Sequence, residues 1–148
     1  IYDNIRISRP EASLDEVKAA AKKADAHEFI RKLPDGYNTM LTGDGANLSQ
    51  GQRQLLSFAR TLAHDPKILI LDEATANIDT ETEQWIQEAL ERLMQGRTSI
   101  MVAHRLSTIQ HADRIIVMHH GQIRESGTHQ ELLKQDGIYK KLYELQLA

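Results

Sequence analysis

Apolar residues recur at helical spacing along the first half of the chain. A Ser-to-Glu capping box at residues 13–16 opens an alanine-rich stretch, and its apolar positions continue to Leu33, where a Pro-Asp-Gly turn follows. Ser49 opens a second segment with the same spacing, which Pro66 brings to an end. We therefore expect one helix between the capping box and Leu33, then a loop, and a second helix after Ser49.

A continuous apolar run, Ile68–Leu71, comes after the second helix. Such a run is typical of a strand covered on both faces, and hence of a parallel sheet between layers of helices. A Thr-to-Glu capping box at residues 80–83 then opens a helix. Its expected inner face consists of Trp85, Ile86, Ala89, Leu90, Leu93 and Met94. The next apolar run, Thr98–Ala103, completes a strand–helix–strand unit, which predicts an α/β fold.

The last third of the chain is organised around turns. Two short strand-like segments, residues 114–118 and 122–125, flank a His-Gly pair, and this arrangement predicts a β-hairpin or two adjacent strands. A Thr-to-Glu box at residues 128–131 predicts a short helix, and a final amphipathic segment follows Gly137. No repeat or linker interrupts the pattern, so we expect one compact unit or part of one.

Composition excludes several classes of function. The 148 residues carry 18 Lys and Arg against 21 Asp and Glu, a net charge of −3, so we expect no basic surface for nucleic acid. There is no Cys, which rules out disulfides and cysteine-ligated zinc and is compatible with a cytosolic location. No apolar run approaches the roughly 20 residues that span a bilayer, so we expect the chain itself to be soluble. Its start at Ile1 rather than Met suggests a piece of a longer protein.

Ser49-Gln50-Gly51-Gln52 carries the first candidate chemistry. Ser with Gln three residues later is an ordinary capping box, and four such boxes occur in this chain, so a purely structural role must be considered. Gly51 favours a further role, because glycine in a first helical turn costs about 1 kcal/mol relative to alanine and lets other groups approach the backbone closely. A helix N-terminus with a hydroxyl and a glycine is suited to receive phosphate oxygens.

Asp72 and Glu73 directly follow the apolar strand. Successive side chains at a strand end point in different directions, so two adjacent acids can serve different tasks. The alternative is a pair of solvated acids at the entry to a loop. His104 directly follows the second strand, and the carboxyl ends of parallel strands share one edge of the sheet, where open α/β folds place ligands. Asp79 or Thr80 could cap the helix that begins near Glu81.

These motifs, taken in order, resemble those of an ABC-type ATPase. Leu48 to Gln54 resembles the signature motif, Ile68 to Glu73 the Walker B motif, residues 76–79 the D-loop, and His104 the H-loop histidine. The likeness covers essentially the whole chain, and Ile1 to Ile5 and Leu33 to Tyr37 resemble exporter-type members. Gln50 stands where the commonest signature has Gly, and Thr42-Gly43 stands where exporters usually carry Gly-Glu.

The resemblance implies a fold and a set of roles. We expect a P-loop NTPase-like (ABC ATPase) parallel sheet flanked by helices, with a helical subdomain over about residues 1–64 and part of the catalytic core over about residues 65–148. Catalytic roles fall to Glu73, which would activate water, and His104, which would contact the γ-phosphate. Asp72 would hold Mg²⁺. Ser49, Gly51 and Gln52 would bind the ATP of a partner domain, and Asp79 would bridge to that partner.

No phosphate-binding loop is present in the sequence. A P-loop follows the pattern G-x-x-x-x-G-K-[ST], and none of the glycines here has that spacing. The resemblance therefore implies the C-terminal portion of an ATPase domain that lacks its front part, including the Walker A motif and the glutamine loop. We expect it to be one of two head-to-tail nucleotide-binding domains, attached to transmembrane domains at the cytoplasmic face of a membrane.

Three functions remain in competition at this stage. The first is ATP hydrolysis that powers substrate export, as in bacterial multidrug or lipid exporters. The second is a soluble ABC ATPase of DNA repair or translation, which the acidic balance and the exporter-like Ile1 to Ile5 segment disfavour. In the third, these residues alone hydrolyse nothing and complete an ATP site in trans.

Overall fold

The computed structural model describes residues 1–72, 80–103 and 106–147, and these fall into two compact units, Ile1–Ile100 and Met101–Ala148. The first contains helices α1 (Tyr2–Ile5), α2 (Leu14–Lys23), α3 (His27–Lys32), η1 (Gly36–Asn38), α4 (Gln50–His64) and α5 (Thr80–Met94), with strand β1 (Ile68–Asp72). Strand β2 (Thr98–Val102) crosses the division. The second contains η2 (Leu106–Thr108), β3 (Ile115–His119), β4 (Gln122–Gly127), α6 (His129–Lys134) and α7 (Ile138–Leu147).

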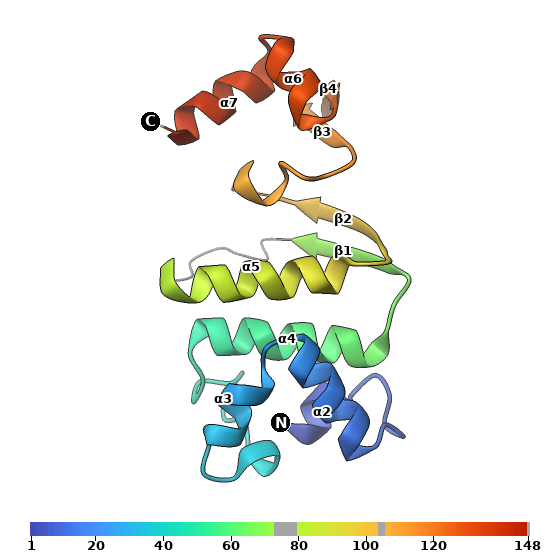
Figure 1. Cartoon of the computed structure of the whole chain (residues 1–148), viewed down its shortest axis with the longest axis vertical. Helices are drawn as coiled ribbons and strands as arrows, with labels where there is room; N and C mark the ends of the chain where they lie inside the picture. Colours follow the sequence, from blue (N-terminus) through green and yellow to red (C-terminus); the bar gives the residue numbers. More distant parts are fainter. Residues whose placement is uncertain (73–79, 104–105, 148) are drawn as a thin grey trace. The chain divides into compact units, whose positions relative to one another are not determined.

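Helix α4 is the central element of the first unit. It contacts α1, α2 and α5, and its apolar side packs Leu55, Leu56, Phe58 and Ala59 into the core. Figure 1 shows α5 lying along α4, with β1 and β2 beyond it. The predicted helix after Ser49 is therefore confirmed, and it is the scaffold on which the first unit is assembled.

The single helix expected up to Leu33 is wrong, because the chain breaks at Asp25. Asp25 has φ 56°, in the left-handed region, and the Ala26 N–H donates to the Ala21 carbonyl oxygen at 2.8 Å. Together these form a Schellman C-cap, which ends α2 and lets α3 begin in a new direction. The Asp25 carboxylate is paired with Arg92 of α5, so a tertiary contact supports the break.

Strand β1 is covered on one face, which corrects the expectation of cover on both. Leu69 and Leu71 are buried, whereas Ile68 and Ile70 are 64% and 71% exposed. Successive strand residues point to opposite faces, and the described part of the chain supplies helices to one of them. Strands β1 and β2 are neighbours in a small sheet and run in the same direction in Figure 1. Ile100 and Val102 of β2 are likewise more than half exposed.

Helix α5 and strand β2 lie where the pattern placed them, with one side chain misassigned. Ile86, Ala89, Leu90 and Leu93 are completely buried, but Trp85 is 57% exposed. The four buried residues form the i, i+3, i+4, i+7 stripe, and Trp85 lies about 90° from the middle of that stripe around the helix. The apolar character of Trp85 led to its assignment to the inner face, but its position on the helix lies outside the buried stripe.

The second unit has its own core around a confirmed β-hairpin. Strands β3 and β4 pair antiparallel, with an irregularity at Val117 and Met118, and His120 and Gly121 form the turn with positive φ at both residues. The core consists of Leu106, Ile115, Val117, Leu132 and Tyr139. Helix α6 begins at the predicted Thr128 cap, whose hydroxyl accepts from the Glu131 N–H.

Candidate functional site

The N-terminus of α4 forms the predicted capping box. The Gln52 N–H donates to the Ser49 hydroxyl oxygen at 3.1 Å, and the Ser49 N–H donates to the Gln52 side-chain oxygen at 3.0 Å. Ser49 and Gln50 are exposed, whereas Gly51 is buried. Ser49 thus fixes the first turn of the helix while its side chain stays at the surface, where a ligand can reach it.

The first turn of α4 carries no acidic residue, unlike those of α2 and α6, whose described N-termini also form complete capping boxes. Helix α2 has Asp15 and Glu16 in its first turn, and α6 has Glu131. Hydrogen bonds from the Ser13 and Thr128 backbone N–H groups and hydroxyls hold the pKa values of Glu16 and Glu131 below their ordinary range, so a negative charge sits on each helix end. In α4 the equivalent residue is neutral Gln52.

This difference matters for binding anions. A helix N-terminus carries the equivalent of about half a positive charge, which nearby carboxylates neutralise. In α4 no carboxylate of the first turn offsets that partial charge, so it remains available to an external anion. The local chemistry therefore fits a phosphate group better at α4 than at α2 or α6.

Asp72 lies at the carboxyl end of β1, on the same side of the first unit as the N-terminus of α4. In Figure 1 β1 and β2 point toward this side, and both α4 and α5 begin there. Asp72 is exposed, so its carboxylate is free to face a ligand. The structure thus places two of the sequence-predicted motifs on one side of this unit. Glu73, Asp79 and His104 lie outside the described residues.

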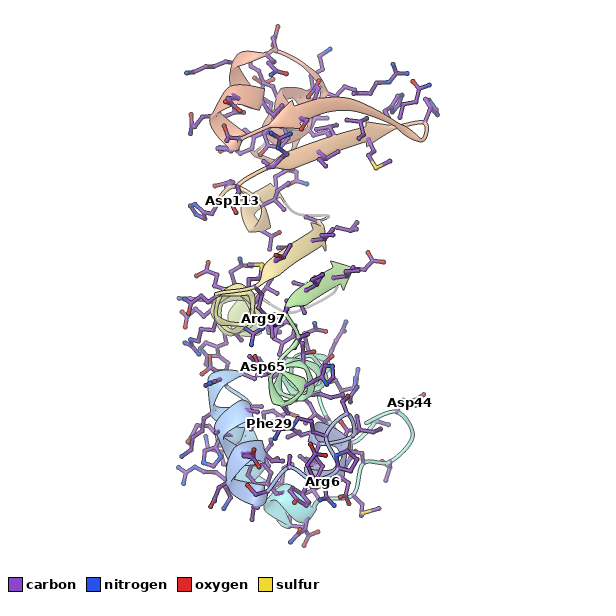
Figure 2. The ribbon with its side chains drawn as sticks, turned by 90° about the vertical axis from the view of Figure 1, so that its right-hand side faces the viewer. Arg6, Phe29, Asp44, Asp65, Arg97 and Asp113 are labelled. Carbon is purple, nitrogen blue, oxygen red and sulfur yellow. The ribbon has the colours of Figure 1, made fainter. Side chains whose placement is uncertain are left out.

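Arg97 fixes the start of the strand that carries Asp72. Its guanidinium donates to the Pro66 carbonyl oxygen at 3.0 Å, to the Leu93 carbonyl oxygen at 2.7 Å and to the Asp65 carboxylate at 2.6 Å. Arg97 and Asp65 lie close to each other in Figure 2. Residue pattern alone does not reveal the role of Arg97, because its partners lie up to 32 positions away.

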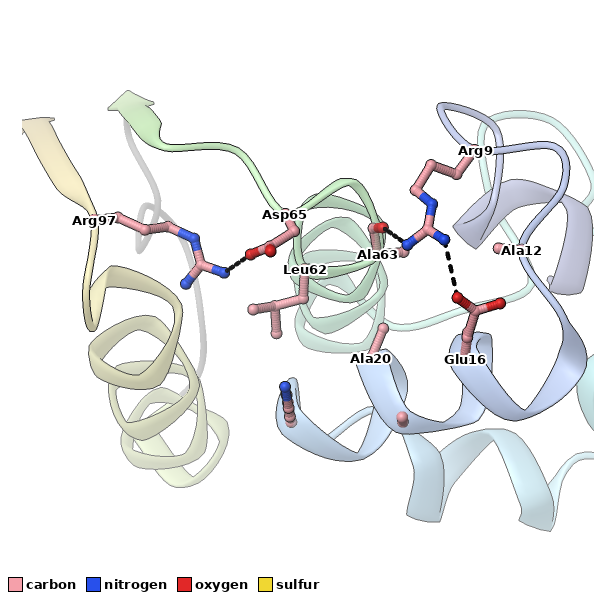
Figure 3. A pocket seen from close by; sticks show the side chains of 10 residues that line it. Arg9, Ala12, Glu16, Ala20, Leu62, Ala63, Asp65 and Arg97 are labelled. Atoms are coloured by element: carbon pink, nitrogen blue, oxygen red, sulfur yellow. Dashed lines mark hydrogen bonds and ion pairs between the residues drawn. The ribbon is translucent and has the colours of Figure 1, made fainter.

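A pocket of about 230 Å³ lies at the opposite end of α4. Its lining includes Arg9, Glu16, Ala63 and Arg97 (Figure 3). Arg9 is paired with Glu16, and Arg97 with Asp65, so these charges already have partners. A helix of 15 residues is about 22 Å long, which separates this pocket from Ser49. The pocket therefore has no part in the candidate site.

Within residues 1–72, 80–103 and 106–147, no three His, Asp or Glu side chains are grouped as a metal site would require. A single carboxylate such as that of Asp72 is compatible with Mg²⁺, because this ion commonly takes one or two protein carboxylates and completes its coordination shell with phosphate and water. Over the same residues, none of the helices has the length and apolar character needed to cross a membrane.

The comparisons with known proteins agree with this geometry. A sequence model of the family described as "ABC transporter" matches residues 2–76. The ABC transporter ATP-binding protein YfiC of Bacillus subtilis is 59% identical over 146 residues, and an ATP-dependent lipid A-core flippase of Chromohalobacter salexigens is 54% identical over 146 residues. Each match covers 99% of this chain and 24% or 25% of the relative.

A solved structure is also similar. A bacterial Atm1-family ABC exporter with ATP bound has a TM-score of 0.89 and 44% identity, over 99% of this chain and 26% of that one. The chain spans about a quarter of the length of the proteins it matches, and it has the ABC ATPase fold. It belongs to the ABC transporter family, as part of an ATP-binding domain of the exporter type.

Proposed function

We propose that this chain contributes the C-terminal portion of an ATPase domain that powers export across a membrane. The carrying observation is the acid-free, capped N-terminus of α4, which lies on the same side of the first unit as the carboxyl end of β1. In this proposal about residues 1–64 act as a helical subdomain and about residues 65–148 as part of a catalytic core. The complete protein sits at the cytoplasmic face of a membrane, attached to transmembrane domains.

In this proposal the residues that follow β1 and β2 act on one ATP molecule, and the residues at the N-terminus of α4 bind another. Glu73 orients the attacking water and takes its proton, and His104 contacts the γ-phosphate of the same nucleotide. Asp72 holds Mg²⁺, which would supply charge neutralisation at the phosphates. Ser49, Gly51 and Gln52 face the nucleotide of a second such domain in a head-to-tail dimer, and Asp79 bridges to that partner. The phosphate-cradling loop comes from another part of the complete protein.

A Glu73→Gln exchange in the complete exporter subunit tests the hydrolytic assignment. We expect steady ATP turnover to fall by about a thousandfold while ATP binding persists, because the amide cannot take the proton. The matched control is Glu88→Gln on α5, whose exposed carboxylate lies 3.6 Å from the Arg92 guanidinium and has no role in the proposed chemistry. Near-normal turnover in Glu73→Gln would show that Glu73 is not the base.

Two further outcomes separate the alternative functions. ATP hydrolysis well above background by the purified 148-residue chain would contradict the proposal that these residues need another part of the protein. Stimulation of the complete protein by DNA, rather than by a transported substrate in reconstituted vesicles, would favour a soluble ABC ATPase. The net charge of −3 and the transporter relatives both support export instead.

A further inference from the structure

The loop before α4 has a defined shape built from its own hydrogen bonds. The Asn47 side chain accepts from the Thr42 N–H at 3.2 Å and donates to the Met40 carbonyl oxygen at 3.0 Å. The Ala46 N–H donates to the Thr42 carbonyl oxygen at 2.8 Å, and the Leu48 N–H to that of Gly45 at 2.9 Å. Hydrogen bonds within and beside segment 42–48, which we call the pre-signature loop, therefore hold its two ends together.

Its backbone conformation is costly for an isolated segment. Gly43, Asp44 and Gly45 have φ of 37°, 51° and 79°, three successive residues in the left-handed region. Glycine adopts such angles readily, but an aspartate there costs about 1 to 2 kcal/mol. Figure 2 shows Asp44 in a part of the chain that stands away from the helices. A loop of this kind keeps one conformation when something outside it holds its middle.

Arg53, in the first turns of α4, makes that contact. Its Nη1 atom donates to the Leu48 carbonyl oxygen at 2.7 Å and to the Gly45 carbonyl oxygen at 3.3 Å. The aliphatic part of the same side chain lies against Gly45, where an added Cβ would come within 3.3 Å of the Arg53 Cδ. The guanidinium thus joins the middle of the loop, and the residue before Ser49, to the body of the helix.

We propose that Arg53 is a positioning residue that holds the pre-signature loop against α4 and thereby fixes how Ser49 is presented to the phosphates of a nucleotide. This inference rests on the proposed function of Ser49. A planar guanidinium suits the task, because one nitrogen can donate to two carbonyl oxygens while the rest of the group stays at the surface. Arg53 also adds positive charge beside a helix end that carries no acid, which further favours an anion there.

The test compares Arg53→Met, Arg53→Lys and the control Arg31→Met in the complete exporter subunit. Arg31 is an exposed arginine on α3 paired with Glu28, so its loss removes the same charge from a different surface. Hydrogen exchange of residues 42–48 should be about tenfold faster in Arg53→Met, intermediate in Arg53→Lys and unchanged in Arg31→Met. Exchange in Arg53→Met equal to that of the unaltered protein would overturn the proposal.

Turnover in the same variants connects the loop to the nucleotide. We expect the KM for ATP to rise about tenfold in Arg53→Met with a smaller change in kcat, because a small misplacement of a positioning group weakens every contact it sets. Ser49→Ala is measured alongside. A raised KM in Ser49→Ala with a normal KM in Arg53→Met would overturn the role of Arg53 alone. A normal KM in both would overturn the proposed function of the signature motif, and with it the positioning role.

Discussion

Arg97 donates to the Asp65 carboxylate with an Nη2–Oδ1 distance of 2.6 Å, and the pair joins the end of α4 to the start of β2 (Figure 3). The two side chains differ in burial, since Arg97 is 12% exposed and Asp65 is 76% exposed. The remaining donors of Arg97 reach carbonyl oxygens of Pro66 and Leu93. The arginine therefore contributes more to stability than its ion pair does.

An Arg97→Met exchange is expected to lower the free energy of unfolding by about 2 to 3 kcal/mol, because two partly buried carbonyl oxygens lose their donor. Asp65→Gly should cost at most about 0.5 kcal/mol, since an exposed ion pair is weak and glycine readily takes the φ of 53° at this position. Urea unfolding of the purified protein measures both. Equal losses in the two variants would show that the ion pair itself dominates.

Gln52→Glu should separate helix stability from nucleotide use. A carboxylate at this position completes the same capping box as Glu16 and should stabilise α4 by about 0.5 kcal/mol through the helix dipole. The same charge should raise the KM for ATP several-fold, because it repels the phosphates proposed to bind here. Gln54→Glu, which adds an acid farther along α4, is the control. A KM change no larger than that of the control would argue against phosphate at this helix end.

The two acidic capping boxes predict a specific pH dependence. Hydrogen bonds from Ser13 to Glu16 and from Thr128 to Glu131 lower both folded-state pKa values from 4.5. Their stabilisation is thus fully present above the unfolded pKa of 4.5 and is lost as pH falls through the lower folded values. A Glu16→Gln, Glu131→Gln double variant should therefore lose less stability than the unaltered protein below that pH. The thermal unfolding midpoints of both proteins, measured from pH 7 to below the folded pKa values, check this. Midpoints that fall in parallel with pH would show that the two capping boxes contribute nothing to the pH dependence.

Gly137→Ala should destabilise the second unit through Glu125. The Glu125 carboxylate accepts from the Ile138 and Tyr139 N–H groups and so caps α7, and an added Cβ at position 137 would clash with its Oε1. We expect a loss of about 1 to 2 kcal/mol as the cap is displaced. In a Glu125→Ala background the same glycine exchange should cost almost nothing. Additive effects in this double-mutant cycle, measured by thermal unfolding, would contradict the steric explanation.

The parts of the fold that sequence predicted well are those whose partners lie close together in the chain. The Ser49 and Thr128 capping boxes join residues three positions apart, so residue type and spacing suffice to specify them. The β3–β4 hairpin is likewise set by its two turn residues. The motif order led to the family, and the family was confirmed, while the roles of Glu73, His104, Asp72 and Asp79 stay predictions.

Sequence reasoning failed where tertiary packing competes with local pattern. Apolar spacing continues through Asp25, but the pairing of its carboxylate with Arg92 favours a break there. Trp85 adds to the apolar count of α5 yet faces away from the core. The continuous run in β1 predicted two covered faces, whereas the described chain covers one. Hydrophobicity reports a preference for burial, and only the arrangement of neighbouring elements decides which residues are buried.

By itself, the sequence determined the caps, the strands, the hairpin and the order of motifs, because each depends on neighbouring residues and on side-chain chemistry. Tertiary structure decided how these parts meet. It places the acid-free end of α4 on the same side as Asp72, anchors β1 through Arg97, and folds Arg53 back onto the loop before Ser49. Apart from the Arg53 contact, these relations join residues that lie far apart in the chain. All of them depend on how the packed helices orient their side chains, and the spacing of residues along the sequence does not encode that orientation.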